Sequence, residues 1–106
     1  MGNIKNVQFG ENVSVVEPTN LYGCKIGNNV KIGPFVEIQK NVRIGKNTRV
    51  HSHTFICEYV TIGSNCFIGH GVVFTNDSLK DGPARGNKLK YKKTKIHDGV
   101  SIGSNS

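Results

Sequence analysis

The sequence has no tryptophan, a single methionine and only three prolines among its 106 residues. It also lacks a run of about 18 apolar residues, the length that a helix needs to cross a bilayer. The amino-terminal stretch MGNIKNVQFGENV has no apolar core of the kind found in secretory signals. These absences predict one small domain over residues 1–106 without a large globular core, no membrane partner and a cytoplasmic location.

Cysteine and negative charge are also scarce. The cysteines Cys24, Cys57 and Cys66 are odd in number and have no CxxC spacing, which disfavours a disulfide framework or a zinc knuckle. Seven acidic residues against 14 basic ones give a net charge of +7, which suits an anionic ligand. Nucleic acid is not an expected partner, because aromatic residues do not alternate with the basic ones.

What the sequence has in abundance is a six-residue repeat. One column of the repeat is large and apolar: Ile26, Ile32, Ile38, Ile44, Val50, Ile56, Ile62, Ile68 and Phe74. A second column is small or β-branched: Val30, Val36, Val42, Thr48, Thr54, Val60, Cys66 and Val72. Neither a helix nor an ordinary strand has a period of six. Both columns are therefore predicted to point into a solenoid. Cys66 belongs to the small column and Cys24 lies one hexad before its first member, so both cysteines are expected to be buried.

One hexad makes one short strand and one tight corner, so three hexads form one triangular coil. Such coils stack through backbone hydrogen bonds about 4.8 Å apart. The segments GNN, GKN and GSN at 27–29, 45–47 and 63–65 recur once in every three hexads, as one corner of this coil requires. Glycine or asparagine is expected there because φ is often positive at tight corners. The sequence thus predicts an all-β parallel β-helix with repeats over about 9–75 and one pentad between Leu21 and Ile26.

The repeat is interrupted by a basic segment at about 76–95 and resumes over 96–106. Half of all basic residues lie in this segment: Lys80, Arg85, Lys88, Lys90, Lys92, Lys93 and Lys95. Gly82, Pro83 and Gly86 disfavour a helix, so one long protruding loop is predicted. Loops longer than about 12–15 residues are usually functional or disordered, and a solvated excursion is the alternative to a ligand-binding loop.

The three-hexad period also brings three of the four histidines to one corner of two adjacent coils. His51 is predicted to lie beneath Gly69, and His53 beneath Gly71. Both therefore flank Ser52, the residue predicted to lie directly below His70. The alternative interpretation is that these histidines are merely exposed corner residues. Neutral imidazole accepts a proton near pH 7, which makes His70 a candidate base or orienting group.

A second polar group is predicted at the next corner, where the basic segment leaves the coil. The residue three hexads before Asn76 is Glu58, so Glu58 is expected one coil below Asn76 and close to Asp77. The two corners together predict a polar cluster beside the basic loop, suited to a ligand that carries phosphates.

The repeat [Ile/Val/Leu]-Gly-x-x-[small]-x resembles that of the left-handed β-helices of the hexapeptide-repeat acyltransferase superfamily. The stretches EPTNLYGCKIGNNVKIGPFVEIQKNVRIGKN and SHTFICEYVTIGSNCFIGHGVVFTND resemble the N-acetyltransferases of nucleotide-linked 3-amino sugars. The nearest resemblance is to enzymes that acetylate UDP-2-acetamido-3-amino-2,3-dideoxy-glucuronate, with a sister group acting on dTDP-3-amino-3,6-dideoxyhexoses. The resemblance covers residues 9–106, and FICE…FIGHGVVFTND is its most specific part.

The resemblance implies a homotrimer in surface-polysaccharide (O-antigen, lipopolysaccharide) biosynthesis. Acetyl-CoA as co-substrate and a nucleotide sugar would bind in clefts between subunits, and no metal is implied. Asn76 would hold the amine or polarise the acetyl carbonyl, beside His70 as the second catalytic residue. The residues implied to contact the sugar nucleotide are His51, His53, Glu58, Asp77 and Arg85, and those implied to lie against the cofactor are Gly69 and Gly71.

The sequence departs from the family pattern at two places. The loop has Pro83-Ala84-Arg85 where the family commonly has Pro-Arg-Ala, and the chain is expected to lack carboxy-terminal coils that contribute to the CoA groove. A truncated, non-catalytic trimeric fragment or scaffold is therefore the main alternative. A zinc-dependent carbonic-anhydrase-like enzyme using His51, His53 and His70 is a weaker one, because His51 and His53 are only two positions apart.

Overall fold

The computed structural model describes residues 3–75 and 94–106. Every regular element among them is a β-strand of two or three residues. The strands are β1 (Asn3–Lys5), β2 (Gln8–Phe9), β3 (Ser14–Val15), β4 (Asn20–Tyr22), β5 (Lys25–Ile26), β6 (Lys31–Ile32), β7 (Glu37–Ile38), β8 (Arg43–Ile44), β9 (Arg49–Val50), β10 (Phe55–Ile56), β11 (Val60–Ile62), β12 (Phe67–Ile68), β13 (Thr94–Ile96) and β14 (Ser101–Ile102). Within these two ranges no helix is long and apolar enough to cross a membrane.

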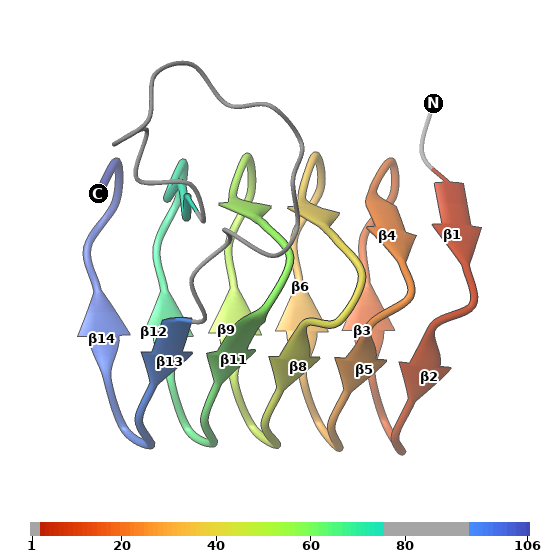
Figure 1. Ribbon diagram of the computed structural model, residues 1–106, viewed down its shortest axis with the longest axis horizontal. Helices are drawn as coiled ribbons and strands as arrows, with labels where there is room; N and C mark the ends of the chain where they lie inside the picture. The colour runs from red at the N-terminus through yellow and green to blue at the C-terminus, as the bar shows by residue number, and fades with distance from the viewer. Residues whose placement is uncertain (1–2, 76–93) are drawn as a thin grey trace.

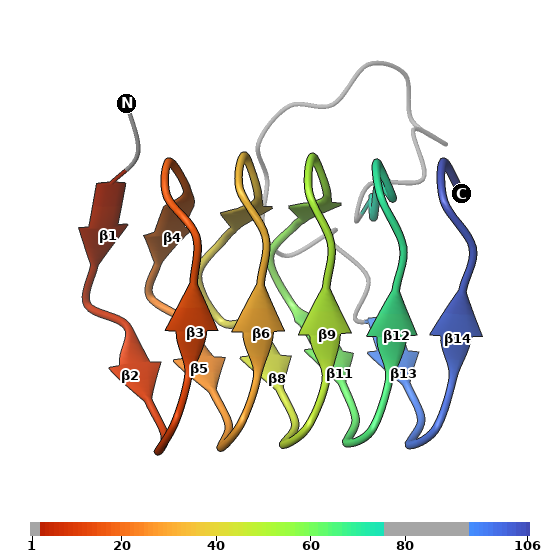
Figure 2. The ribbon, with the colours of Figure 1, turned by 180° about the vertical axis from the view of Figure 1, so that it is seen from behind.

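The strands form three parallel sheets, one on each side of a triangular rod. Sheet A has the order β1-β4-β7-β10, sheet B has β13-β11-β8-β5-β2, and sheet C has β14-β12-β9-β6-β3. In Figure 1 the chain descends through sheet B on the near side and rises through sheet C on the far side while it advances from right to left. Figure 2 shows the same rise from behind. The coil is therefore left-handed, and the predicted left-handed parallel β-helix is confirmed.

The strand register confirms the three-hexad coil and the predicted pentad. Ile68 pairs with Val50, three full hexads earlier, whereas the paired Leu21 and Ile38 are separated by one residue fewer. Ile4 and Leu21 pair with the same shortened spacing, so the segment from Ile4 to Phe9 is a second pentad. The repeat therefore begins at β1, ahead of the predicted start at residue 9.

Both inward columns of the repeat are buried and form one continuous core. Leu21, Ile38 and Ile56 are fully inaccessible at the centre of sheet A. The predicted burial of Cys24 and Cys66 is confirmed, and Cys57 is buried as well. Burial raises the pKa of the Cys24 thiol to about 11 and also raises the pKa of Cys57, so both remain protonated near neutral pH.

At the corner between sheets B and C (the BC corner), glycine and asparagine are needed for different reasons. Asn29, Asn47 and Asn65 have φ of 60°, 60° and 59°, which confirms the expected left-handed conformation for asparagine. The preceding glycines serve a different purpose. A Cβ on Gly45 would lie 2.6 Å from the carbonyl carbon of Gly63, so glycine is required there by the close approach of the next coil.

Strands β13 and β14 continue the stacking of sheets B and C. Ile96 pairs with Ile62 in sheet B, and Ile102 pairs with Ile68 in sheet C. Strand β13 begins at Thr94, so the last two residues of the predicted loop belong to sheet B. The rest of that predicted loop lies outside the described residues.

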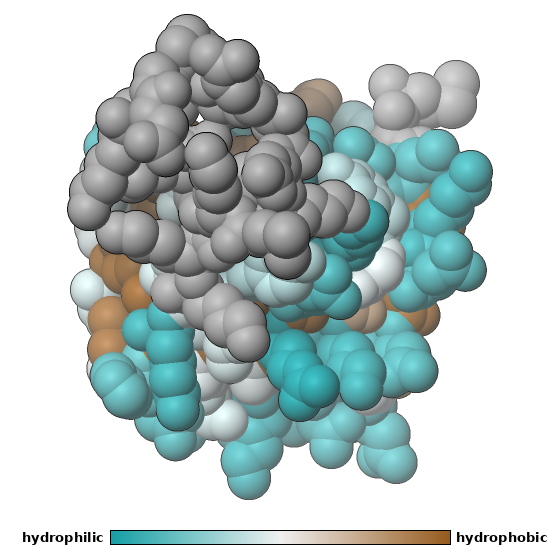
Figure 3. Space-filling view, in the orientation of Figure 1, coloured by the Kyte–Doolittle hydropathy of each residue, from teal (hydrophilic) through white to brown (hydrophobic). Residues whose placement is uncertain are grey.

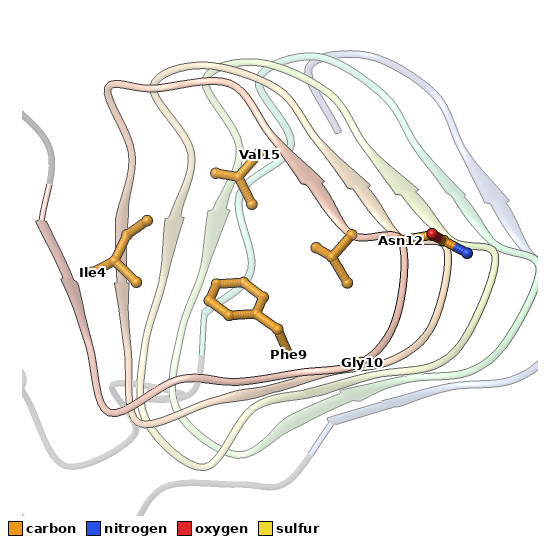
Figure 4. Close-up of a pocket in the computed structure, with 6 residues that line it drawn as sticks. Ile4, Phe9, Gly10, Asn12 and Val15 are labelled. Carbon is orange, nitrogen blue, oxygen red and sulfur yellow. The ribbon is translucent and has the colours of Figure 1, made fainter.

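The outer faces of the rod differ in character. The outward column of sheet B, which runs along the lower half of Figure 3, is polar and mostly basic, with Lys25, Arg43 and Lys95 in one row. At the amino-terminal end, the first coil leaves apolar side chains uncovered, and Ile4 and Phe9 project over the core in an open basin (Figure 4).

Candidate functional site

The histidines gather at the corner between sheets C and A (the CA corner). Three of its four-residue turns lie on successive coils at 33–36, 51–54 and 69–72, and the turn 103–106 follows on the next coil. The third residue of each turn, Phe35, His53, Gly71 or Asn105, has a positive φ of 60°, 63°, 63° or 63°. The Gly71 amide donates a 2.9 Å hydrogen bond to the carbonyl oxygen of Ser52 in the coil below. The side chains of successive turns are therefore held in register along the rod.

His70 contacts two residues of the coil below it. Its Nδ1 lies 2.9 Å from the hydroxyl oxygen of Ser52. Its ring centroid lies 4.8 Å from that of His51, with the two rings tilted by 58°. The His70 backbone amide donates a 3.1 Å hydrogen bond to Ser104 Oγ in the coil above. The predicted placement of His51 and His70 on adjacent coils is thus confirmed.

His51 is held in its neutral form by its surroundings. Burial lowers the pKa of the imidazole, and the positive charges of His70 and Arg49 lower it further. The opposite wall is the ring of Phe67, whose centroid lies 4.7 Å away. His51 Nε2 is buried and has no hydrogen-bond partner among the described residues. The ring of His51 therefore contacts Phe67 and His70 through packing and without a hydrogen bond from Nε2.

His53 faces the coil below and lies away from His70. Its ring stacks on Phe35 with the centroids 5.0 Å apart and the planes 25° apart. The three histidines share the predicted corner, but the contacts pair His51 with His70 and pair His53 with Phe35. Within residues 3–75 and 94–106, no group of three or more His, Cys, Asp or Glu side chains is placed to hold a metal ion.

Of Gly69 and Gly71, both predicted to lie against a cofactor, Gly69 is required by the stacking of the coils and Gly71 has a positive φ of 63°. A Cβ on Gly69 would lie 2.7 Å from the backbone nitrogen of Ser104, and one on Gly71 would lie 2.7 Å from Asn105 Oδ1. The carbonyl oxygen of Gly69 also accepts a 2.9 Å hydrogen bond from Thr54 Oγ1. The backbone at both positions is therefore fixed close to His70.

Glu58 lies at the corner between sheets A and B (the AB corner), as predicted. Its backbone amide donates a 3.2 Å hydrogen bond to Gln39 Oε1, and its carboxylate lies 3.7 Å from Lys40 Nζ. Gln39 in turn donates a 3.0 Å hydrogen bond from Nε2 to Glu37 Oε2. Burial and the two carboxylates of Glu37 and Glu58 raise the pKa of Tyr22 on the same face. This corner therefore has a connected polar network that extends over two coils.

The remaining predicted site residues, Asn76, Asp77 and Arg85, lie outside the described residues. The structure also identifies site residues that the sequence analysis did not select, namely Ser52, Phe35 and Phe67. The signal for two of them was present, because Ser52 comes three hexads before His70 and Phe35 comes three hexads before His53.

Two comparisons with known proteins bear on this site. The family model described as "Bacterial transferase hexapeptide (six repeats)" matches residues 23–58. Among solved structures, the chain is similar to the acetyltransferase domain of PglB from Neisseria gonorrhoeae FA1090, in complex with acetyl coenzyme A. The TM-score is 0.63 at 17% sequence identity, over 94% of this chain. No curated protein matches the sequence.

The likeness to the PglB domain concerns the fold. This chain spans 49% of that domain's length, which is about half. The matched family segment, 23–58, covers two complete coils and contains His51, His53 and Glu58. The hexapeptide repeat and the β-helix are thus supported by sequence, by structure and by both comparisons.

Proposed function

We propose that this chain is the β-helix of an acetyltransferase that transfers the acetyl group of acetyl-CoA to the amine of a nucleotide-linked amino sugar. The observation that carries the proposal is the imidazole of His70, held at the CA corner by Ser52 and packed against the neutral ring of His51. The match to the hexapeptide transferase model and the likeness to an acetyl-CoA-bound acetyltransferase domain support the reaction class. The sugar nucleotide, the pathway of surface-polysaccharide synthesis and the cytoplasmic location belong to the same proposal.

In the proposed reaction, the neutral amine nitrogen attacks the thioester carbonyl carbon, the N–C bond forms and the C–S bond breaks. His70 accepts the proton that the amine loses, and that proton leaves with the thiolate of coenzyme A as the free thiol. A sugar amine with a pKa near about 8, like an α-amino group, is already partly neutral at pH 7. Positioning supplies most of the rate, since alignment contributes about 7–11 kcal/mol in the best intramolecular cases.

The second polar corner completes the proposed site. Glu58, fixed by Gln39 and next to Lys40, would orient the sugar ring, while His53 and His51 would meet a substrate amide or carboxylate. The resemblance assigns the amine or the carbonyl to Asn76 and a further sugar contact to Asp77. It assigns the diphosphate to Arg85 and the loop lysines, whose cationic groups pair well with phosphate.

Exposed aromatic residues beside His51 and His53 support the proposed homotrimer. Phe35 is 57% exposed and Phe67 is 42% exposed. An aromatic residue gains little by remaining in water, and large exposed apolar groups commonly mark interfaces. In the proposed trimer these two rings are covered by a neighbouring subunit, so that the ligand cleft forms next to His70.

The test starts from the full 106-residue chain. We expect size-exclusion chromatography with light scattering to show a trimer, and calorimetry to show binding of acetyl-CoA and of a UDP-linked amino sugar. We expect His70→Ala to lower kcat/KM for acetyl transfer by about 100- to 10,000-fold, the range of a lost general base. The control is His97→Ala, which changes a histidine next to the BC corner and should leave kcat/KM unchanged.

A non-catalytic trimeric scaffold is the second candidate, favoured by the fact that the chain spans only 49% of the PglB domain. The same experiments separate the two. Binding of neither ligand by a trimeric chain favours the scaffold. Binding of the sugar nucleotide without acetyl-CoA assigns the CoA groove to additional coils, and unchanged kcat/KM in His70→Ala contradicts the role of His70.

A further inference from the structure

We infer that Ser52 is a positioning residue that fixes the ring tautomer of His70. Its hydroxyl oxygen accepts the hydrogen bond of Nδ1–H, which leaves the Nε2 lone pair able to accept a proton. The choice between the two tautomers and the role in acetyl transfer rest on the proposed function, whereas the contact between the two side chains does not. The juxtaposition that carries the inference is the 2.9 Å separation of Ser52 Oγ and His70 Nδ1 across two coils.

The backbone holds these two atoms at hydrogen-bonding distance. Gly71 donates to the carbonyl oxygen of Ser52 at 2.9 Å, and Asn105 donates to the carbonyl oxygen of His70 at 2.7 Å. His51 donates to Ile68 at 2.9 Å, immediately before the turn that bears His70. The turn that bears His70 is therefore hydrogen-bonded to the coil below it and to the coil above it. A separation of 2.9 Å is typical of a formed hydrogen bond.

No other side chain competes for the ring. Among the described residues, Ser52 is the only side chain that hydrogen-bonds the His70 imidazole, because Ser104 contacts only its backbone amide. His51 offers the ring an aromatic edge and no polar contact. Burial and the neighbouring charges lower the pKa of His51, so this neighbour is uncharged at neutral pH. Among the described residues, the Ser52 hydroxyl is thus the one side-chain group placed to bias the His70 tautomer, and the tautomer it favours depends on whether it donates or accepts.

The chemistry of imidazole determines which tautomer is useful. Neutral histidine has one N–H donor and one acceptor nitrogen, and a serine hydroxyl is able to meet either. If Ser52 donated to Nδ1, the proton would sit on Nε2, and neither nitrogen would be free to accept the proton of the amine. If Nδ1–H donates to Ser52, Nε2 accepts that proton and the hydrogen bond is kept. The bond then becomes stronger, because its donor is charged.

The test reads the tautomer directly by long-range ¹H–¹⁵N correlation of the histidine rings in the uniformly labelled, full-length chain above pH 8. The His70 signals are assigned by their loss in His70→Gln. We expect the Nδ1–H tautomer in the wild type, a shift towards a mixture in Ser52→Ala, and the wild-type pattern in Ser52→Thr, which keeps the hydroxyl. Ser104→Ala is the control, because it removes a contact to the His70 backbone and leaves the ring contact in place. Amide spectra of all variants check the fold.

Two results overturn the inference: an Nε2–H tautomer in the wild type, or an unchanged tautomer in a folded Ser52→Ala. In turnover, we expect Ser52→Ala to lower kcat roughly tenfold, the effect of one hydrogen bond, with KM unchanged. If the chain has the Nδ1–H tautomer but shows no acetyl transfer, the proposed function alone is contradicted. The inference that Ser52 fixes the tautomer of His70 is then still supported. Turnover that depends on His70 but is unaffected in Ser52→Ala contradicts the positioning role alone.

Discussion

The BC and CA corners have the same backbone turn and present different side chains. Each turn has four residues, and its third residue has a positive φ. In the BC corner this residue is always asparagine in the described 27–29, 45–47 and 63–65 segments, with φ between 59° and 60°. In the CA corner the equivalent residues are Phe35, His53, Gly71 and Asn105, at φ of 60°, 63°, 63° and 63°.

The difference between the corners concerns strain and exposure. A left-handed conformation costs about 1–2 kcal/mol for most L-residues, while asparagine tolerates it better. The BC corner uses the tolerant residue at every one of these coils. The CA corner bears the cost at Phe35 and leaves that ring 57% exposed, so burial does not offset it. Local strain that brings little burial supports the proposed trimer, in which a neighbouring subunit covers the ring of Phe35.

A buried threonine in each of the two corners makes the same pair of hydrogen bonds. In the BC corner, Thr48 Oγ1 donates to the carbonyl oxygen of Gly63 at 2.8 Å and accepts from the Cys66 amide at 3.1 Å. In the CA corner, Thr54 Oγ1 makes the same pair of bonds to Gly69 and Val72, at 2.9 Å and 3.3 Å. The two corners therefore differ in their exposed side chains and share the same buried hydrogen bonds.

The largest expected effect tests the shared frame. In Gly45→Ala the new Cβ would lie 2.6 Å from the carbonyl carbon of Gly63 and 2.7 Å from the nitrogen of Ser64, both backbone atoms that cannot move independently. We expect a loss of about 3 kcal/mol in the free energy of unfolding, the upper part of the usual range for overpacking. Urea unfolding measures it.

Gly103→Ala is the matched control for this substitution, because no atom of residues 3–75 and 94–106 outside its own neighbourhood lies within 4 Å of its Cβ position. It should change stability by less than about 0.5 kcal/mol, as an exposed substitution does. Equal effects at the two positions would show that close stacking of the coils is not the reason for the glycine.

The threonine bonds give the next largest effect. Thr54→Val keeps the shape of the side chain but leaves the buried Gly69 carbonyl and Val72 amide without this partner, so we expect a loss of about 2 kcal/mol. Thr19 is the matched control, because its hydroxyl is buried and has no hydrogen-bond partner among the described residues. Thr19→Val should stabilise the fold by about 1 kcal/mol. Opposite signs in thermal or urea unfolding confirm the assignment, and a destabilising Thr19→Val contradicts it.

The fold was predictable from the sequence because its period is imposed by packing. The inward columns must meet the core once in every hexad, and three hexads close a triangle, so each residue stacks on the one three hexads before it. The same arithmetic placed His51 on the coil below His70, which the 4.8 Å contact between the rings confirms. Residues inside the rod are thus determined by their spacing alone.

Features that depend on side-chain rotamers or on the next coil were not predictable in this way. Spacing places Ser52 under His70, but the hydrogen bond depends on the χ angles of both residues. Spacing also groups His53 with the other histidines, whereas the contact of its ring is with Phe35 of the coil below. Glycine at the BC corner was expected for its φ, and its actual reason, the approach of the next coil to Gly45, is visible only once the coils are stacked.

Exchanging the residues at the third turn position tests the difference between the corners directly. Asn47→Phe places an exposed aromatic ring in the left-handed conformation, and we expect a loss of about 1 kcal/mol in unfolding free energy. Phe35→Asn removes the strain but also the stacking on His53, so we expect a gain of only about 0.5 kcal/mol. In light scattering, Phe35→Asn should weaken the proposed trimer and Asn47→Phe should not. A trimer unaffected by Phe35→Asn would contradict the role given to this ring.

The smallest expected effect concerns pH and the histidine that takes a glycine position in the CA corner. His51 is the first residue of its turn, where the turns of the coils below and above have Gly33 and Gly69. Burial, followed by the charges of His70 and Arg49, lowers the pKa of His51. As the pH falls below about 6.5, the unfolded chain therefore binds a proton at this position before the folded chain does. The free energy of unfolding then decreases from about pH 6.5 downward, until the folded imidazole is protonated too, and is unaffected by this group above about pH 7.5.

His51→Gln removes this titration while keeping a side chain of similar size. We expect its unfolding free energy, measured in urea between pH 4.5 and 8, to decrease less steeply below pH 6.5 than that of the wild type. All other titrating groups are common to both chains, so the difference between the two curves isolates His51. Added salt should reduce the part due to His70 and Arg49 and leave the part due to burial, because salt screens exposed charges more than it changes desolvation. Parallel curves would mean that the ring of His51 is solvated at the CA corner, and that it does not form the apolar wall against which His70 is held.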